Sequence, residues 1–185
     1  MGRGKLIVIS GASGVGKGTV LGKMMEKRKD LQFSVSATTR PPRPNEVDGV
    51  HYYFITKEQF RDMIAKGEFL EYDAHAANYY GTPRHQAEEK CRKGHVLLDI
   101  EPKGAAQVRR SDPDAVLIFI MPPSMQELER RLRGRGDTPE DQIALRMERA
   151  VWEMEQRGWY DYVVVNDDAD RCADEILHIL SELEE

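Results

Sequence analysis

The sequence predicts an α/β fold, with a parallel sheet covered by helices and a smaller subdomain inserted into it. Three observations support this prediction. Short apolar runs alternate with segments of helical periodicity. A glycine-rich turn joins the first such run to a helical segment. A stretch rich in proline, glycine and tyrosine then interrupts the alternation.

Four apolar runs are the predicted strands of the sheet. They are residues 5–10, 96–100, 116–121 and 162–165. Aliphatic and β-branched residues dominate them, as is typical of strands. The runs do not alternate apolar with polar residues, so we expect strands buried on both faces.

The helices of the sheet domain are predicted from start signals and apolar stripes. One helix follows the glycine-rich turn over about residues 16–29. Ser124 and Glu127 form a capping-box pattern at the start of another. Pro139 after Thr138 indicates a third start. The last segment repeats Ile176, Leu177 and Leu180 at helical spacing.

Residues 34–83 are predicted to form the inserted subdomain, which leaves 1–33 and 84–185 as the core domain. The insert contains one recognisable helix. Thr56 and Gln59 form its capping box, Phe60 begins its buried face and Gly67 ends it.

Composition excludes several classes of protein. The formal net charge is −5, whereas a broad nucleic-acid-binding face needs a basic surplus. Apolar runs fall short of the roughly 18 residues that span a bilayer, and the N-terminal run is too short for a signal peptide. The two cysteines, Cys91 and Cys172, are expected to be free thiols. We therefore expect a cytoplasmic protein.

The glycine-rich loop after the first predicted strand can bind phosphate. Its glycines let the backbone turn so that several N–H groups point at one anion. The following helix adds the positive end of its dipole, and Lys17 can reach the β- and γ-phosphates of a nucleotide. A turn that binds no ligand is the alternative. The predicted ATP-binding residues here are Gly11, Ala12, Ser13, Gly14, Val15, Gly16, Lys17, Gly18 and Thr19.

The predicted metal ligands depart from the usual pattern of a phosphate-binding loop. Gly18 follows Lys17, where Ser or Thr usually holds Mg²⁺. Thr19, one residue later, is the predicted ligand, unless the ion keeps more of its water. Asp99 follows a buried strand, where a carboxylate commonly orients Mg²⁺ and its waters. A turn or helix-cap role is the alternative for Asp99.

The insert contains candidate residues for a second phosphate. Arg40 and Arg43 lie in a proline-stiffened segment, and guanidinium forks match phosphate oxygens. Glu46 is close enough in sequence to orient one of them. A solvated basic loop is the alternative. Tyr52, Tyr79 and Tyr80 could donate to phosphate or pack on a purine, or could simply pack the subdomain.

Glu71 is the candidate residue for base recognition. Guanine presents N1–H and its 2-amino group side by side, and one carboxylate accepts from both. Adenine would face the same carboxylate with the lone pair of N1, at a cost. Ser36 and Thr82 could donate to guanine O6. An ordinary surface glutamate is the alternative for Glu71.

Several segments of the chain resemble motifs of the guanylate kinase family, in the same order. They are GASGVGKGT, SVSATTRPPRPNEVDGVHYYF, EFLEYDAHAANYYGT, LLDIEPKGA, RLRGRGDT and VVVNDD, and they cover nearly the whole chain. The resemblance implies a P-loop kinase core, a GMP-binding subdomain at 34–83 and a lid at about 124–150. It also implies phosphoryl transfer from Mg²⁺-ATP to GMP or dGMP.

The same resemblance implies roles for single residues. Ser36, Glu71 and Thr82 would read guanine. Glu101 departs from the family's more usual Asp, and Pro102-Lys103 departs from a hydrophobic-Gln pair. The implied GMP-binding residues are Ser36, Arg40, Arg43, Glu46, Tyr52, Glu71, Tyr79, Tyr80, Gly81, Thr82, Asp99 and Glu101.

Three lid arginines, Arg131, Arg135 and Arg146, resemble those that close over the ATP phosphates. Arg131 and Arg135 share one helix face, although a charged, solvated helix is the alternative. Asn166 resembles the residue that contacts adenine.

The implied mechanism needs no general base, because the acceptor phosphate is already a nucleophile. Catalysis would align two phosphates and neutralise their charge, through Mg²⁺ and Lys17, Arg40, Arg43, Arg131, Arg135 and Arg146. Closure would exclude water. The expected partners are ATP and GMP or dGMP, without nucleic acid or membrane, for a monomer or small homo-oligomer. The rivals are a kinase for another nucleoside monophosphate and a non-catalytic interaction module.

Overall fold

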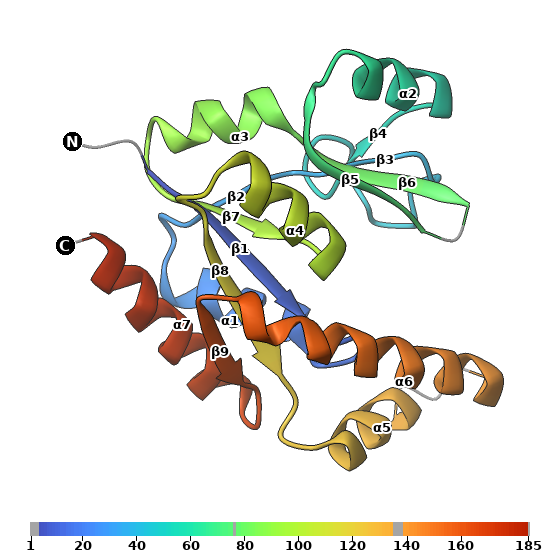
Figure 1. The fold of residues 1–185 in the computed structure, drawn as a ribbon, viewed down its shortest axis with the longest axis vertical. Coiled ribbons are helices and arrows are strands. Elements are labelled where there is room, and N and C mark those ends of the chain that lie inside the picture. Colours follow the sequence, from blue (N-terminus) through green and yellow to red (C-terminus); the bar gives the residue numbers. More distant parts are fainter. Residues whose placement is uncertain (1–3, 76, 135–138, 185) are drawn as a thin grey trace. The chain divides into compact units, whose positions relative to one another are not determined.

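A parallel sheet is the centre of the α/β fold, as the sequence predicts. The computed structural model describes residues 4–75, 77–134 and 139–184. The strand order of the sheet is β2-β7-β1-β8-β9 (Figure 1). The strands are β1 (Leu6–Gly11), β2 (Gln32–Phe33), β7 (Val96–Asp99), β8 (Val116–Met121) and β9 (Tyr162–Val165).

The two ends of this sheet have parallel pairings. β2 pairs with β7 in the register Gln32 to Val96, and β8 pairs with β9 in the register Ile118 to Tyr162. Every residue of β1 is buried, in agreement with the prediction from its unbroken apolar run.

The prediction of burial on both faces is wrong for β9. Val164 is buried, but Val163 and Val165 are 45% and 43% exposed. β9 is the last strand in the sheet order, and α7 (Ala169–Glu184) packs against it. Successive strand residues face opposite sides, so one side of β9 is covered and the other is open.

A second sheet is built entirely from residues of the predicted insert. Its order is β4-β3-β6-β5, and β6 pairs antiparallel with both β3 and β5. The strands are β3 (Ala37–Thr38), β4 (Tyr53–Phe54), β5 (Phe69–His75) and β6 (Asn78–Pro83). Helix α2 (Lys57–Ala65) packs against β6 and buries Phe60 against Phe69.

The remaining helices lie between successive strands along the chain. They are α1 (Lys17–Lys27), α3 (Arg84–Cys91), α4 (Pro102–Ser111), α5 (Met125–Gly134), α6 (Glu140–Glu155) and the 3₁₀ helix η1 (Gln156–Trp159). Of these, α3 leads from β6 of the second sheet to β7 of the first. α1 packs along α7, and α4 packs along β5. Cys91 and Cys172 are buried, and neither forms a disulfide within the described residues. Among the described helices, none is both long enough and apolar enough to cross a bilayer.

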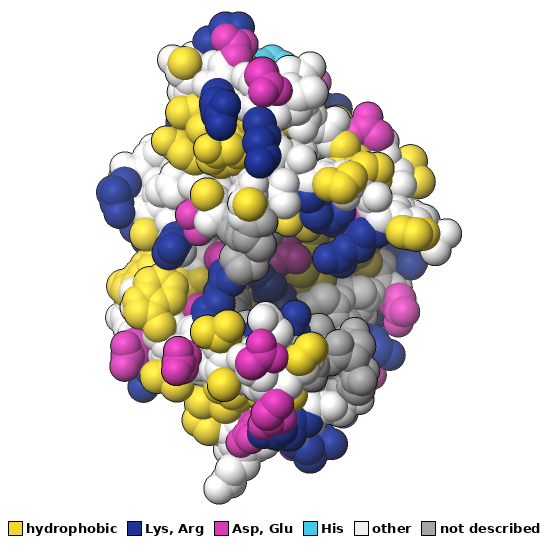
Figure 2. Space-filling model, turned by 90° about the vertical axis from the view of Figure 1, so that its right-hand side faces the viewer, with side chains coloured by type: hydrophobic (Ala, Val, Ile, Leu, Met, Phe, Trp, Pro, Cys, Tyr) yellow, Lys and Arg dark blue, Asp and Glu magenta, His cyan; other side chains and the backbone are white. Residues whose placement is uncertain are grey.

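The chain forms two compact units. Unit 1 comprises Met1–Val8 and Gln32–Val116, and unit 2 comprises Ile9–Leu31 and Leu117–Glu185. The predicted GMP-binding residues therefore belong to unit 1, and the glycine-rich loop belongs to unit 2. Lys and Arg side chains are mixed with Asp and Glu side chains on the face that Figure 2 shows.

Candidate functional site

The glycine-rich loop of unit 2 joins β1, which ends at Gly11, to α1, which begins at Lys17. Gly14 and Gly16 have φ angles of 84° and 91°, a region that favours glycine. A Cβ atom on Gly14 would also lie 2.5 Å from Leu132 Cδ2. The loop conformation therefore requires glycine at both positions.

Side chains from outside the loop hold one of its carbonyl groups. The Val15 carbonyl accepts from Asn166 Nδ2 at 2.8 Å and from Arg131 Nη1 at 3.1 Å. Asn166 is buried. Arg131 also donates to Glu127, at 2.8 Å. Two residues predicted to contact ATP thus bind the loop itself in this structure.

The other predicted lid arginines have different positions. Arg146 lies on α6 and is partly buried, whereas Arg135 falls outside the described residues. Neighbouring arginines form ion pairs on the helix surface, as the alternative reading proposed: Arg130 binds Glu127 at 2.7 Å and Arg133 binds Glu129 at 2.8 Å.

The predicted metal ligands are exposed in both units. Thr19 lies in the first turns of α1, and Asp99 ends β7. Within the described ranges, no cluster of three or more His, Cys, Asp or Glu residues could hold a metal. A hydroxyl and a carboxylate are nonetheless hard oxygen donors, and Mg²⁺ usually takes one or two protein ligands plus phosphates and water. The donor types therefore fit Mg²⁺.

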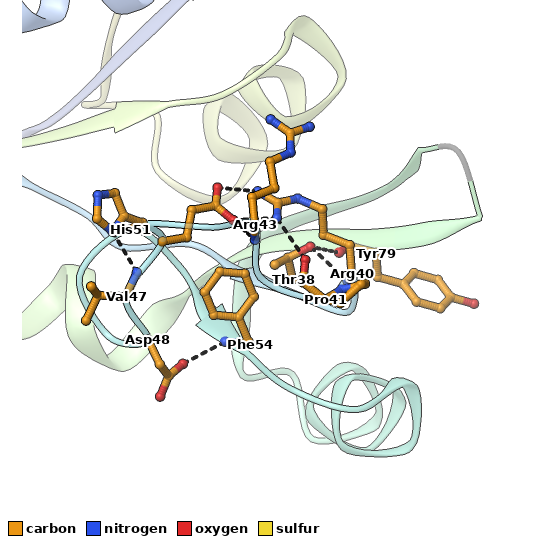
Figure 3. A network of polar contacts seen from close by, with 10 residues as sticks. Thr38, Arg40, Pro41, Arg43, Val47, Asp48, His51, Phe54 and Tyr79 are labelled. Atoms are coloured by element: carbon orange, nitrogen blue, oxygen red, sulfur yellow. Dashed lines mark hydrogen bonds and ion pairs between the residues drawn. The ribbon is translucent and has the colours of Figure 1, made fainter.

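An ion pair organises the candidate phosphate-binding segment of unit 1 (Figure 3). Arg40 donates Nη1 to Glu46 Oε2 at 2.6 Å and Nη2 to Oε1 at 2.7 Å. The Arg43 backbone N–H donates to the same carboxylate at 2.8 Å. These contacts lower the pKa of Glu46 to about 2, chiefly through the Arg40 hydrogen bond. The carboxylate therefore stays ionised and holds Arg40 in place.

Aromatic rings surround the same guanidinium. The Arg40 Cζ atom lies 5.0 Å from the centroid of the Tyr52 ring and 5.7 Å from that of Phe54. The ring of Tyr80 meets Tyr52 edge-on at 6.2 Å. Tyr79 differs, because its ring stacks on Phe60 at 5.2 Å. The structure thus groups Tyr52 and Tyr80 with Arg40, while the Tyr79 ring packs in the subdomain core.

Glu71 is a buried carboxylate, not a surface glutamate. It is 6% exposed, and Thr82 Oγ1 donates to its Oε1 at 2.6 Å. Burial raises the pKa of Glu71 to about 7, with smaller contributions from the charges of Asp73 and Glu101, although the hydrogen bonds from Thr82 oppose the shift. The structure therefore brings Glu71 and Thr82 together, and their recognition of guanine stays a prediction.

Gly104, on α4, touches this carboxylate and was not singled out from the sequence. A Cβ atom there would lie 2.4 Å from Glu71 Oε2. The glycine thus makes room for the carboxylate. Its motif, LLDIEPKGA, is visible in the sequence, but the contact depends on the packing of α4 along β5.

The remaining predicted GMP-binding residues also belong to unit 1. Glu101 is the exposed N-cap of α4. The charge of Asp99 helps to raise the pKa of Tyr52, behind the larger effect of burial. Gly81 is buried on β6 and Ser36 is partly buried before β3. A Cβ atom on Gly81 would lie 2.9 Å from Phe69 Cδ1, so its role in packing is visible here.

Comparison with known proteins points to one family. A family model described as guanylate kinase matches residues 3–183. A guanylate kinase from Nostoc sp. is 51% identical over 166 residues, which are 89% of this chain and 83% of that protein. One from Thermus thermophilus is 49% identical over 180 residues, 97% of this chain and 81% of that protein.

A solved structure agrees with these relatives. The crystal structure of guanylate kinase from Anaplasma phagocytophilum matches with a TM-score of 0.77 at 36% sequence identity. The match covers 97% of this chain and 86% of that chain. The similarity therefore extends over the fold as well as the sequence.

Proposed function

Because this chain belongs to the guanylate kinase family, we propose that it transfers the γ-phosphoryl group of ATP to GMP or dGMP. The products are ADP and GDP or dGDP. The observation that carries the choice of acceptor is the buried carboxylate of Glu71 beside Thr82. An ionised carboxylate there would accept from both donors on the guanine edge.

The glycine-rich loop is the proposed ATP site. Its positive-φ glycines and the start of α1 present backbone N–H groups to the phosphates. Lys17 would neutralise the β- and γ-phosphates, and Arg131 and Arg146 would add positive charge from α5 and α6. Arg131 would have to exchange part of its contact with Glu127 for the nucleotide.

The segment around Arg40 is the proposed GMP phosphate site. Glu46 occupies both Nη atoms of Arg40, so its first role is to orient the guanidinium. Arg43, whose side chain is exposed, and the hydroxyls of Tyr52 and Tyr80 would supply further donors. This arrangement supports recognition of one phosphate with fixed geometry.

Mg²⁺ is the proposed cofactor, with Thr19 and Asp99 as the residues that would hold it directly or through water. When bound, it would neutralise the charge that develops on the transferred group. The protein would act by positioning and charge neutralisation, with no general base. The cytoplasm is the proposed location, which two cysteines outside any disulfide fit. The proposed assembly is a monomer or small homo-oligomer.

A coupled assay of ADP release tests this function. Purified protein with Mg²⁺-ATP should turn over GMP and dGMP, and should use AMP, UMP and dTMP at least about a thousandfold less efficiently, since a hydrogen-bonding site rejects mismatched partners strongly. Equal use of AMP would support the rival monophosphate kinase. ATP binding without turnover of any acceptor would support the non-catalytic module.

A further inference from the structure

A buried carboxylate outside the predicted site binds the glycine-rich loop. Glu153, on α6, is 2% exposed. Its Oε2 accepts from the backbone N–H of Ser13 at 2.7 Å. Its Oε1 accepts from Arg149 Nε at 2.9 Å, and Arg149 is itself partly exposed. The sequence shows only an ordinary charge pair spaced by four residues.

The burial of this charge needs an explanation. An ionised carboxylate loses its hydration when buried, and only charge-assisted hydrogen bonds offset that loss. Two such bonds come here from a guanidinium and from a peptide group of the loop. The hydrogen bond to Ser13 forms in one particular conformation of the loop. The buried carboxylate of Glu153 therefore stabilises that conformation.

Glu153 acts on a different peptide group from the other anchors. Arg131 and Asn166 hold the carbonyl of Val15, two residues beyond the N–H that Glu153 holds. The loop is thus held at two backbone groups, the N–H of Ser13 and the carbonyl of Val15. A loop fixed in this way loses less conformational entropy when a phosphate binds.

The position of Glu153 on α6 adds a second effect. Arg146, Arg149 and Glu153 are spaced by three and four residues, so they share one face of the helix. Contact between Glu153 and the loop anchors this face. It also sets the position of Arg146, two turns earlier, relative to the loop.

We propose that Glu153 is a positioning residue for the nucleoside triphosphate, which holds the glycine-rich loop in its binding conformation and fixes α6 against it. The proposal rests on the proposed function, because that function makes ATP the ligand of the loop. It assigns Glu153 no contact with the substrate.

Calorimetry on Glu153→Gln tests the proposal. The probes are adenylyl imidodiphosphate with Mg²⁺, and GMP alone. Gln keeps the size of the side chain but removes its charge, so the Kd for the triphosphate analogue should rise about tenfold, the scale of one lost charge-assisted hydrogen bond. The Kd for GMP should change less than twofold, because the GMP residues belong to unit 1. Glu148→Gln, exposed on the same helix, should match the wild type.

The outcomes separate the alternatives. An unchanged Kd for the analogue, or equal losses for the analogue and GMP, would overturn the positioning role. If Glu153→Gln does not fold, Glu153→Asp takes its place, because Asp keeps the charge on a shorter side chain. The Kd for the triphosphate analogue should then rise by a few fold, without a matching rise in the Kd for GMP. An unchanged Kd for the analogue in Glu153→Asp would also overturn the positioning role. A wild type that binds both nucleotides but transfers no phosphoryl group would refute the proposed function and leave this result standing.

Discussion

The protonation of Glu71 should make stability depend on pH. Its pKa is about 7 in the folded protein, against 4.5 for the free side chain, mainly because it is buried. Between these values the folded chain holds a proton that the unfolded chain has released. The free energy of unfolding should therefore fall as pH rises from about 4.5 to about 7, by up to about 3 kcal/mol.

Glu71→Gln should lack this slope, since the amide does not titrate. Chemical denaturation of wild type and variant at pH 5 and pH 8 measures the difference. We expect the variant to gain stability relative to the wild type at pH 8. Parallel pH profiles for the two proteins would show that the carboxyl does not carry the buried proton.

Gly104→Ala should damage GMP recognition more than stability. The new Cβ would overlap Glu71 Oε2, the far end of a side chain, so the carboxylate should shift while the helix stays in place. We expect kcat/KM for GMP to fall about tenfold or more, with KM for ATP little changed. Steady-state kinetics with each substrate varied checks this.

Gly22→Ala is the matched control, because nothing lies within 4 Å of its added Cβ. Both substitutions place alanine in a helix, which by itself is stabilising. Wild-type kinetics for Gly104→Ala would mean that Glu71 can move without loss of function.

Single residues differ in how far the sequence reveals them. Glu71, Thr82 and Ser36 were predicted to read guanine from its chemistry and the family motifs. The structure brings Glu71 and Thr82 together, while their role in reading guanine stays a prediction. Gly104 and Glu153 were missed for one physical reason: each acts through a contact between segments far apart in the chain. A glycine in a helix and a Glu four residues after an Arg have common local explanations.

At the scale of elements, the capping box of α2 should stabilise the subdomain. Gln59 N–H donates to Thr56 Oγ1 at 3.1 Å, and Gln59 Oε1 accepts from the Thr56 N–H at 2.8 Å. Thr56→Ala removes the first bond and should lower the free energy of unfolding by about 1 kcal/mol. Urea denaturation measures this, and Thr56→Ser should retain most of the stability. Equal losses for Ala and Ser would rule out the cap as the cause.

Elements with strong local signals were predicted well. α2, with its capping box, and the buried strands β1, β7 and β8 were all expected. The short strands β2, β3 and β4 were not, since a strand of two residues has no period to detect. For β9 the strand was right but its burial was wrong, because an apolar run does not reveal that a strand lies at a sheet edge.

At the scale of the whole molecule, the fold class follows from the alternation of strands and helices, and the structure confirms it. The domain boundaries at 33/34 and 83/84 stay a prediction. The two compact units divide the chain within β1, just before β2 and at the start of β8. A linear sequence does not show such a division.

The proposed division of the substrates between the units gives the last prediction. A ligand that binds only the folded state stabilises it by about 3 kcal/mol at a hundred times its Kd. Adenylyl imidodiphosphate and GMP should therefore each raise the melting temperature of the wild type. Lys17→Ala should lose the shift from the analogue and keep that from GMP, while Glu71→Gln should show the reverse.

The same variants connect binding to catalysis. Lys17→Ala should also lose about 100-fold or more in kcat, because one charged donor to the phosphates is removed. Lys29→Ala, an exposed lysine just beyond α1, should keep both the activity and the shifts. If Lys17→Ala kept normal turnover, or if each variant lost both shifts together, the separate assignment of ATP to the loop and GMP to the Glu71 site would fail. Selective loss in each case would tie each nucleotide to the residues of one unit.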